Sequence, residues 1–168
     1  MKKKTVTIEI EQEAYERINQ ALAKFWKYEI GGMLIGYQKG RNHFSISEAT
    51  VADDVKHLSI SGFIREPIKS MKLLLKAFKR KSHNYIGEWH SHPQFALYPS
   101  PADIKTMKGI ISDPGYGVNF ALLIITKLKN GRVNMAGFLF HKELSNFVEA
   151  SISQGITGNT KAGINIKV

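Results

Sequence analysis

Two histidines and an aspartate lie within fourteen residues and have the chemistry of metal ligands. His90 and His92 stand two positions apart, and Asp103 ends the run Ser-Pro-Ala-Asp that begins at Ser100. On an extended segment, residues i and i+2 point to the same side with Cα atoms about 6.6 Å apart, so both imidazoles can reach one cation. Asp103 can supply a third ligand from the first turn of the next helix. The fourth tetrahedral position then remains for water, as in catalytic zinc sites.

A hydrolytic site of this kind also needs a base and a donor to the oxyanion. The hydroxyl of Ser100 can donate to a tetrahedral oxyanion, a contribution of about 3 kcal/mol in comparable acyl-transfer sites. The same hydroxyl can accept from a backbone amide and cap the helix. Two residues are candidates for the base. Glu88 shares the strand face of the histidines, whereas Glu29 opens a Gly-rich strand that another backbone can approach closely. The residues alone favour neither.

Size and composition indicate one globular domain. The chain has 168 residues, of which 43% are hydrophobic, and it has no cysteine. The lack of cysteine excludes disulfides, thiolate ligands and a cysteine nucleophile, and it is compatible with the cytoplasmic location that we expect. The basic N-terminus leads into an alternating strand rather than a signal peptide, and no apolar run approaches the ~20 residues that span a bilayer. The net charge of +10 favours acidic partners, but we expect neither nucleic acid nor a membrane.

The periodicity of apolar residues predicts alternating strands and helices, with hairpins between some strands. Helix 66–81 is expected to bury Ile68, Met71, Leu74, Leu75 and Phe78. These patterns predict a mixed sheet flanked by helices, formed by a domain of residues 1–150. Residues 151–168 are expected to form a flexible tail with a short strand at 164–166. The expected strands are 4–10, 29–36, 44–51, 84–90, 119–126 and 133–141, and the expected helices are 11–25, 66–81 and 100–112.

The whole constellation resembles the JAMM (MPN) metallopeptidase family. That family has an upstream Glu, then His-Ser/Thr-His, seven residues, Ser, two residues and Asp, and this chain matches it with Glu29, His90-Ser91-His92, Ser100 and Asp103. The resemblance implies a zinc cofactor, with Glu29 rather than Glu88 as the base. It also implies the cytidine-deaminase-like α/β fold, a three-layer α/β/α arrangement. The implied activity is cleavage of isopeptide or peptide bonds after the C-terminus of ubiquitin or a ubiquitin-like protein.

Within this family, the run Tyr85–Pro93 is similar to compact bacterial members. They include the deconjugating peptidase of antiphage operons that also encode a cyclic-oligonucleotide synthase and a protein resembling fused ubiquitin-activating and ubiquitin-conjugating enzymes. A ubiquitin-like protein or its conjugate is the implied substrate, and the fusion enzyme is a further implied partner. The interval after Asp103 is too short for a long ubiquitin-gripping insertion. Candidate substrate contacts are therefore Arg65, Phe95, Tyr98 and the loop 113–117.

Two other functions are compatible with the same family. Some members are nonenzymatic interaction modules, which have a broken ligand set, whereas every ligand position is filled here. Others are associated with DNA, which the basic charge would suit. Metal content distinguishes the first alternative from an enzyme, and a steep salt dependence of DNA binding would support the second.

Overall fold

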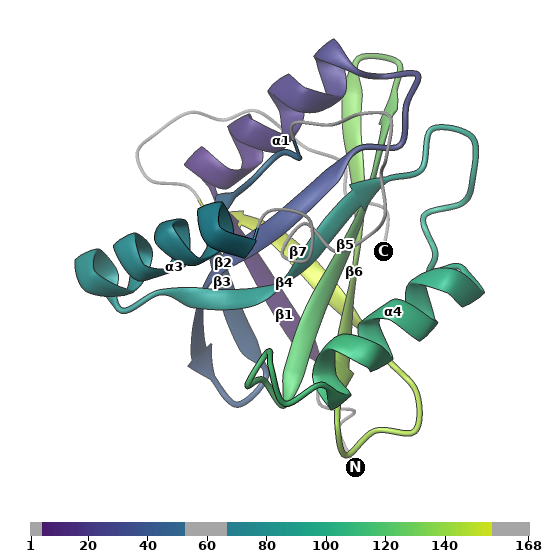
Figure 1. The fold of residues 1–168 in the computed structure, drawn as a ribbon. Coiled ribbons are helices and arrows are strands. Elements are labelled where there is room, and N and C mark those ends of the chain that lie inside the picture. The colour runs from purple at the N-terminus through teal and green to yellow at the C-terminus, as the bar shows by residue number, and fades with distance from the viewer. Residues whose placement is uncertain (1–4, 53–66, 156–168) are drawn as a thin grey trace.

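The computed structural model describes residues 5–52 and 67–155, and for residues 67–70 the backbone only. In these described ranges, three helices and seven strands follow one another largely as the periodicity predicts (Figure 1). The hairpin β2–β3, the helix after Ser100 and the hairpin β5–β6 are confirmed. The elements are β1 (Val6–Glu11), α1 (Gln12–Lys24), β2 (Gly31–Gly40), β3 (His43–Ala49), α3 (Pro67–Lys81), β4 (Asn84–Ser91), α4 (Pro101–Ser112), β5 (Phe120–Lys129), β6 (Arg132–His141) and β7 (Val148–Gly155).

The strands form a closed mixed barrel in the order β1-β3-β2-β4-β5-β6-β7. The expected three-layer α/β/α arrangement is therefore wrong. β7 pairs in parallel with β1 along the whole of Val6–Glu11, and this pairing joins what would otherwise be the two edges of an open sheet. No residue of β7 is buried and its sequence is rich in polar residues. The local pattern thus gave no sign of the strand that closes the barrel.

Helices nevertheless pack on both faces of the sheet, as alternate residues of β5 show. Leu122 and Ile124 join one apolar cluster with the buried side of α1. Leu123 and Ile125 join a second cluster with the buried side of α4. β4 lies between β2 and β5 and pairs with both, so its residues are in the interior of the sheet. The candidate metal ligand His90 therefore stands on a strand supported from both sides.

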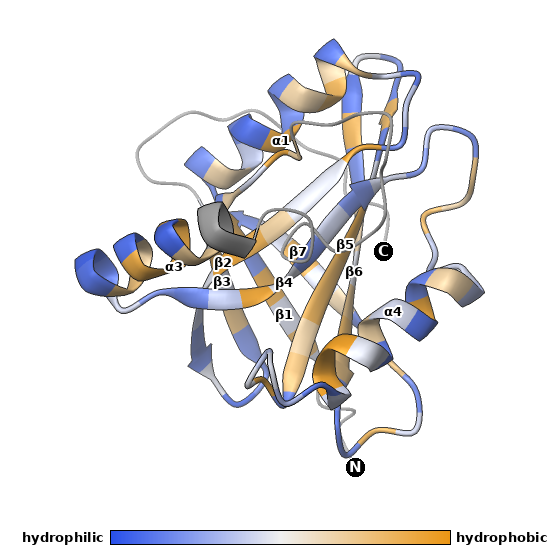
Figure 2. Ribbon diagram, viewed as in Figure 1, coloured by the Kyte–Doolittle hydropathy of each residue, from blue (hydrophilic) through white to orange (hydrophobic). Residues whose placement is uncertain are grey.

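The apolar residues expected to be buried on α3 are in part exposed. Met71, Leu75 and Phe78 are 56%, 52% and 55% exposed, while Leu74 is half-buried and packs against the second cluster. The i, i+4, i+7 spacing puts these three exposed residues on one side of the helix, with basic residues between them in the sequence. Apolar and hydrophilic residues accordingly alternate along the ribbon of α3 (Figure 2). Periodicity identifies such a stripe but does not say whether another element covers it. The side chain of Ile68 lies outside the described residues.

The C-terminal boundary also differs from the expectation. Residues 151–155, expected to belong to a flexible tail, are the part of β7 that pairs with Thr7–Glu11. The rest of that tail, with the short strand expected at 164–166, lies outside the described residues. In the described part of the chain, no helix has both the length and the apolar character needed to cross a membrane.

Candidate metal centre

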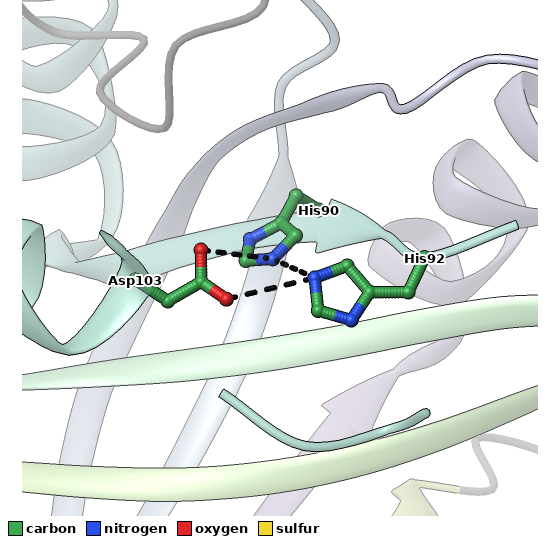
Figure 3. Close-up of side chains that lie close together, drawn as sticks. All are labelled: His90, His92 and Asp103. Atoms are coloured by element: carbon green, nitrogen blue, oxygen red, sulfur yellow. Dashed lines mark hydrogen bonds and ion pairs between the residues drawn. The ribbon is translucent and has the colours of Figure 1, made fainter. Parts of the chain in front are cut away.

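The side chains of His90, His92 and Asp103 converge on one point (Figure 3). His90 is the penultimate residue of β4 and His92 directly follows the strand, so alternation places both rings on the same side. Their Nε2 atoms are 2.9 Å apart, and each lies 3.5 Å from an oxygen of Asp103. The three residues are 8%, 6% and 3% exposed. The ligand set expected from the spacing is thus brought together in the fold.

Two of the three distances suit a tetrahedral cation, whereas the 2.9 Å between the two Nε2 atoms is shorter than such a site requires. For bonds of about 2.0–2.1 Å, two ligand atoms at tetrahedral positions lie about 3.3–3.4 Å apart. The two distances of 3.5 Å from imidazole nitrogen to carboxylate oxygen agree with this geometry. Two imidazoles and one carboxylate are also a donor set that zinc accepts. The three side chains can therefore hold a metal ion and leave one position open.

The start of α4 fixes the carboxylate of Asp103. The Ser100 hydroxyl accepts from the Asp103 amide at 3.2 Å, and the Ser100 amide donates to Asp103 Oδ2 at 2.7 Å. This reciprocal pair is a capping box, and Pro101 occupies the first helical position. The capping role considered for Ser100 is confirmed. Because its hydroxyl proton is not used by the cap, Ser100 can still donate to a substrate.

Charge complementarity holds the three side chains together without a metal. Burial alone would raise the pKa of Asp103, but hydrogen bonds from His90 and His92 outweigh it and hold that pKa well below its usual range. Asp103 in turn raises the pKa of His92, chiefly by hydrogen bonding, while burial opposes the increase. A metal ion binds the neutral form of imidazole, so it would displace a proton from this cluster.

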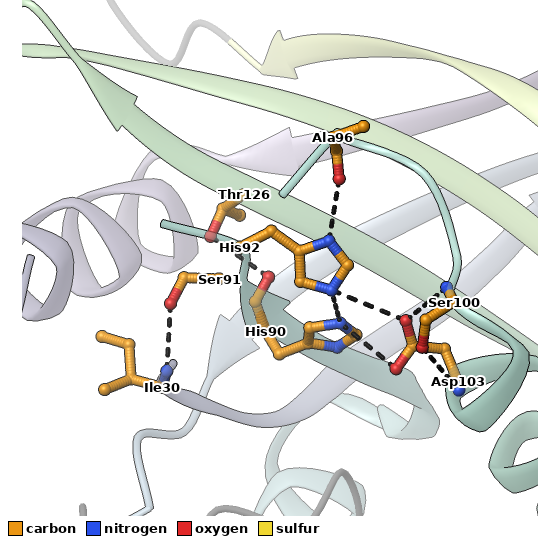
Figure 4. Close-up of polar contacts among 8 residues, drawn as sticks. All are labelled: Ile30, His90, Ser91, His92, Ala96, Ser100, Asp103 and Thr126. Atoms are coloured by element: carbon orange, nitrogen blue, oxygen red, sulfur yellow. Dashed lines mark hydrogen bonds and ion pairs between the residues drawn. The ribbon is translucent and has the colours of Figure 1, made fainter. Parts of the chain in front are cut away.

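The ring of His92 is oriented by a hydrogen bond from the nitrogen that points away from the cluster. Its Nδ1 donates to the carbonyl of Ala96 at 2.8 Å (Figure 4). This bond assigns a proton to Nδ1, so in the neutral ring that a metal requires the Nε2 lone pair is directed at the cluster, which is how second partners orient metal-binding histidines. Ala96 belongs to the loop that connects β4 to α4. The loop between the ligands thus has an orienting role that its sequence did not reveal.

A cavity of about 660 Å³ opens beside the cluster. One side is formed by the His-Asp segment (residues 90–103), and the other by the Glu29 segment (residues 28–32). The carboxylate of Glu29 is close enough to contribute to the raised pKa of His92. The described residues that line the cavity are Glu29, Ile30, Gly31, Gly32, Ala52, His90, His92, Phe95, Ala96, Tyr98, Ser100, Ala102, Asp103 and Thr106.

Glu29 itself is exposed and lies two residues before β2, not on the strand as the sequence suggested. Ser91 holds its segment in place (Figure 4). The Ser91 hydroxyl accepts from the amide of Ile30 at 3.0 Å and donates to the carbonyl of Tyr28 at 3.1 Å. Ser91 had no predicted role of its own. Its position between the two histidines, with its side chain on the opposite strand face, was the available signal.

The rival base, Glu88, has a different environment. It is completely buried and accepts a hydrogen bond from the hydroxyl of Tyr85 at 2.9 Å. Burial and the neighbouring Glu88 carboxylate raise the pKa of Tyr85 well above its ordinary value. Glu88 is not among the described residues that line the cavity. Its place on the strand face of the histidines therefore does not bring it to the cavity.

The candidate substrate contacts fall into three groups. Phe95 and Tyr98 line the cavity and are 62% and 51% exposed. The loop 113–117 is not among the described residues at the cavity, and Tyr116 in that loop lies instead against the ring of Tyr85. Arg65 lies outside the described residues. The exposed aromatic side chains therefore belong to the loop between the candidate ligands.

The fold and the site define a class of protein that the family comparison confirms. The model of the Prok-JAB family, the prokaryotic homologs of the JAB domain, matches residues 11–137. The chain therefore belongs to this family, and the resemblance to JAMM/MPN proteins is confirmed. The solution structure of protein DSY2949 from Desulfitobacterium hafniense has a similar fold, with a TM-score of 0.61 over 88% of this chain and 92% of that one, at 17% identity.

Three curated relatives carry the name "CD-NTase/cGAS isopeptidase". The protein from Enterobacter hormaechei is 30% identical over 120 residues, which are 71% of this chain and 66% of that protein. The protein from Escherichia coli is 34% identical over 89 residues, 50% of this chain and 55% of its own length. The protein from Vibrio cholerae is 31% identical over 90 residues, 51% of this chain and 56% of its own length. The chain thus spans between half and two thirds of the length of these relatives.

Proposed function

We propose that this protein is a zinc-dependent isopeptidase that hydrolyses the bond after the C-terminus of a ubiquitin-like protein. The observation that carries the proposal is the cavity in which a buried His-His-Asp cluster faces an exposed glutamate. The printed name of the three relatives supports the reaction class. A ubiquitin-like conjugate is the substrate class that best suits an isopeptidase of this family.

His90, His92 and Asp103 are the proposed zinc ligands. Zinc held by two imidazoles and one carboxylate supplies Lewis acidity and lowers the pKa of water at the site to about 7. The chain has no cysteine, so nitrogen and oxygen ligands are the ones it offers. The bond from His92 to the Ala96 carbonyl and the capping box at Ser100 keep two of these side chains aligned. Such partners reduce the reorganisation that metal binding requires.

Glu29 and Ser100 are the proposed catalytic residues. Glu29 takes a proton from the attacking water as its oxygen bonds to the carbonyl carbon, and it then returns that proton to the leaving amine as the bond from this carbon to nitrogen breaks. The exposure of Glu29 suits a group that must receive and release a proton. Ser100 donates its hydroxyl proton in a hydrogen bond to the oxyanion. Glu29 and Ser100 both line the cavity that His90 and His92 face.

The relatives' name suggests that the conjugated target is a CD-NTase, a nucleotidyltransferase. We propose a role in removing a ubiquitin-like protein from such a target in a bacterial antiphage system. Phe95 and Tyr98 are the described residues best placed to contact the extended C-terminal tail, because both are exposed aromatic side chains at the cavity. Aromatic anchors of this kind often dominate the binding energy of an interface.

The test is cleavage of a model conjugate, in which the tail of a ubiquitin-like protein is joined to a reporter. Zinc-loaded wild type is compared with a chelated sample and with zinc-loaded Glu29→Gln, which keeps the size of the side chain and removes its charge. Glu13→Gln, an exposed glutamate on α1, is the matched control. We expect chelation to abolish detectable turnover and Glu29→Gln to reduce it to a small residual rate, while Glu13→Gln retains full turnover. Full activity of zinc-loaded Glu29→Gln would contradict the proposed mechanism.

A further inference from the structure

One buried hydroxyl connects the proposed base to the strand of the proposed ligands. Ser91 is 1% exposed and lies between His90 and His92. Its Oγ accepts from the amide of Ile30 at 3.0 Å and donates to the carbonyl of Tyr28 at 3.1 Å. In addition, the Ser91 amide donates to the carbonyl of Ile30 at 2.7 Å. These three bonds fall on the residues immediately before and after Glu29.

The register of the sheet does not fix Glu29 by itself. β2 begins at Gly31, which pairs with His90, so Glu29 lies before the first paired residue of the strand. Gly31 lies directly against β4, because a Cβ at this position would contact the Trp89 carbonyl and approach within 2.9 Å of the His90 Cβ. The chain before Gly31 is held against the end of β4 by the bonds of Ser91. One donor and one acceptor on a single short side chain thus set the path of the backbone on both sides of Glu29.

Strand alternation explains why Ser91 can do this. His90 and His92 point to the metal side of β4, so Ser91 between them points to the opposite face. The ligand rings and the hydroxyl are therefore attached to three consecutive residues, and any shift of this strand moves both together. We infer that Ser91 is a positioning residue that fixes the distance between Glu29 and the His-His-Asp cluster. This inference rests on the proposed function, because it assigns the residue a part in that reaction.

The step that depends on this distance is proton transfer. A base must lie within hydrogen-bond reach of the proton that it takes, and a displacement of about 1 Å in such a site can cost about 100-fold in rate. Loss of the hydroxyl would free the carbonyl of Tyr28 and the amide of Ile30. The bond from the Ser91 amide to the Ile30 carbonyl, the proposed ligands and their orienting bonds would stay in place. Turnover should therefore fall with little change in substrate binding or in metal affinity.

The experiment compares Ser91→Thr with Ser91→Val, which have the same shape and differ in the hydroxyl. We expect kcat of zinc-loaded Ser91→Val to be about 10- to 100-fold below that of Ser91→Thr. KM and zinc stoichiometry should agree within about twofold, as expected if neither the substrate contacts nor the ligands change. Ser91→Ala, which adds no volume, replaces the pair if the branched residues prevent folding. Equal kcat for the Thr and Val variants, or loss of zinc from the Val variant alone, would overturn the inference.

A double-mutant cycle tests whether Ser91 acts through Glu29. In a Glu29→Gln background, Ser91→Thr and Ser91→Val should have the same residual rate, because the group that the hydroxyl positions is no longer functional. A difference between the two variants that is as large as in the Glu29 protein would show a purely structural effect and contradict the inference.

Amide hydrogen exchange provides a readout that does not require activity. In metal-free and in zinc-loaded protein, the peptide containing residues 28–32 should exchange faster in Ser91→Val than in Ser91→Thr. Equal exchange would contradict the positioning role even if the proposed function is correct. Conversely, exchange could be faster in Ser91→Val while the Glu29→Gln protein is fully active. That result would support the role of Ser91 in holding residues 28–32 and would reject Glu29 as the base.

Discussion

The two sides of the cavity are built in different ways. In the His-Asp segment, the proposed ligand side chains are buried, and two of them are fixed by neighbours close in sequence, His92 by Ala96 and Asp103 by Ser100. In the Glu29 segment, the side chain of the proposed base is exposed, and its backbone is fixed by a residue some sixty positions away. The first arrangement is buried and depends on contacts close in sequence, whereas the second is exposed to solvent and depends on a contact distant in sequence.

The difference matches the two kinds of chemistry. Metal ligands must present lone pairs in a fixed geometry, so burial and short hydrogen bonds are an advantage. A proton carrier must exchange with water and with a leaving group, so it has to stay accessible. Changes in the His-Asp segment should therefore affect metal binding, whereas changes in the Glu29 segment should affect turnover with the metal retained.

The largest effect is expected from Asp103→Asn. The amide can still accept from the Ser100 backbone, so the cap of α4 is preserved while the charge of the proposed ligand is lost. We expect zinc affinity to fall by more than about 100-fold and turnover to be lost with the metal, because even changes in the partners of ligands cost 10–100-fold. Competition with a chromogenic chelator measures the affinity. Zinc binding as tight as in the wild type would show that Asp103 is not a ligand.

A smaller effect is expected from Ser100→Ala, which separates two functions of one hydroxyl. Loss of the cap should lower the free energy of unfolding by about 1 kcal/mol. Loss of the oxyanion donor should lower kcat by about 100- to 1,000-fold, with zinc retained. Ser100→Thr keeps the hydroxyl and serves as the control. A Ser100→Ala protein that is less stable but fully active would reduce Ser100 to a capping residue.

Gly31→Ala should disturb the Glu29 segment through its backbone. The new methyl group would contact the Trp89 carbonyl on β4, so β2 must move away, at a cost of about 1–3 kcal/mol in stability. We expect reduced kcat with normal zinc content, measured on the same samples as chemical denaturation. Gly109→Ala on α4, where a Cβ has nothing within 4 Å, is the matched control. It should instead stabilise the protein by about 0.5–1 kcal/mol. Loss of zinc from Gly31→Ala would contradict the expectation that changes in the Glu29 segment leave metal binding intact.

The smallest effect is expected far from both sides, at the exposed pair of Lys39 and Glu9, whose charged atoms are 2.8 Å apart. The hydrogen bond from Lys39 lowers the pKa of Glu9. Its contribution to stability is thus present above the ordinary pKa of glutamate and is lost as pH falls through the lowered value. Lys39→Met should slightly reduce the urea midpoint at pH 7, with no difference in strong acid and no change in activity. Lys129→Met at the β5–β6 turn is the control.

The candidate site was predictable as far as its signals are local. The spacing of His90 and His92 and the helix start at Ser100 placed the three ligand side chains together, because strand alternation and capping depend only on neighbours. Strand alternation made Glu88 as eligible as Glu29. The structure separates the two because Glu88 is buried against Tyr85 while Glu29 is held at the cavity through Ser91. That separation depends on the pairing of β2 with β4, which spacing along the chain does not reveal.

The fold was predictable in its elements but not in its closure. Helices and hairpins follow from periodicity and turn residues, whereas the pairing of β1 with β7 joins residues about 145 positions apart in a strand with no buried side chain. Likewise, periodicity marked an apolar stripe on α3, although Met71, Leu75 and Phe78 face outward. In both cases the local sequence does not show which other element a strand edge or a helix face packs against, because that depends on how the whole chain folds.

The central position of β4 also bears on the order in which the protein folds and acquires its proposed metal. Its amides are bonded to β2 on one side and to β5 on the other, and beyond the strand the amide of His92 donates to Thr126. Such strands open only with the most costly unfolding events. The chain can therefore fold first and acquire its proposed zinc later, unlike small zinc domains that need the metal to fold. Cells short of zinc would then accumulate a folded, dormant protein that a rise in metal supply could switch on without new synthesis.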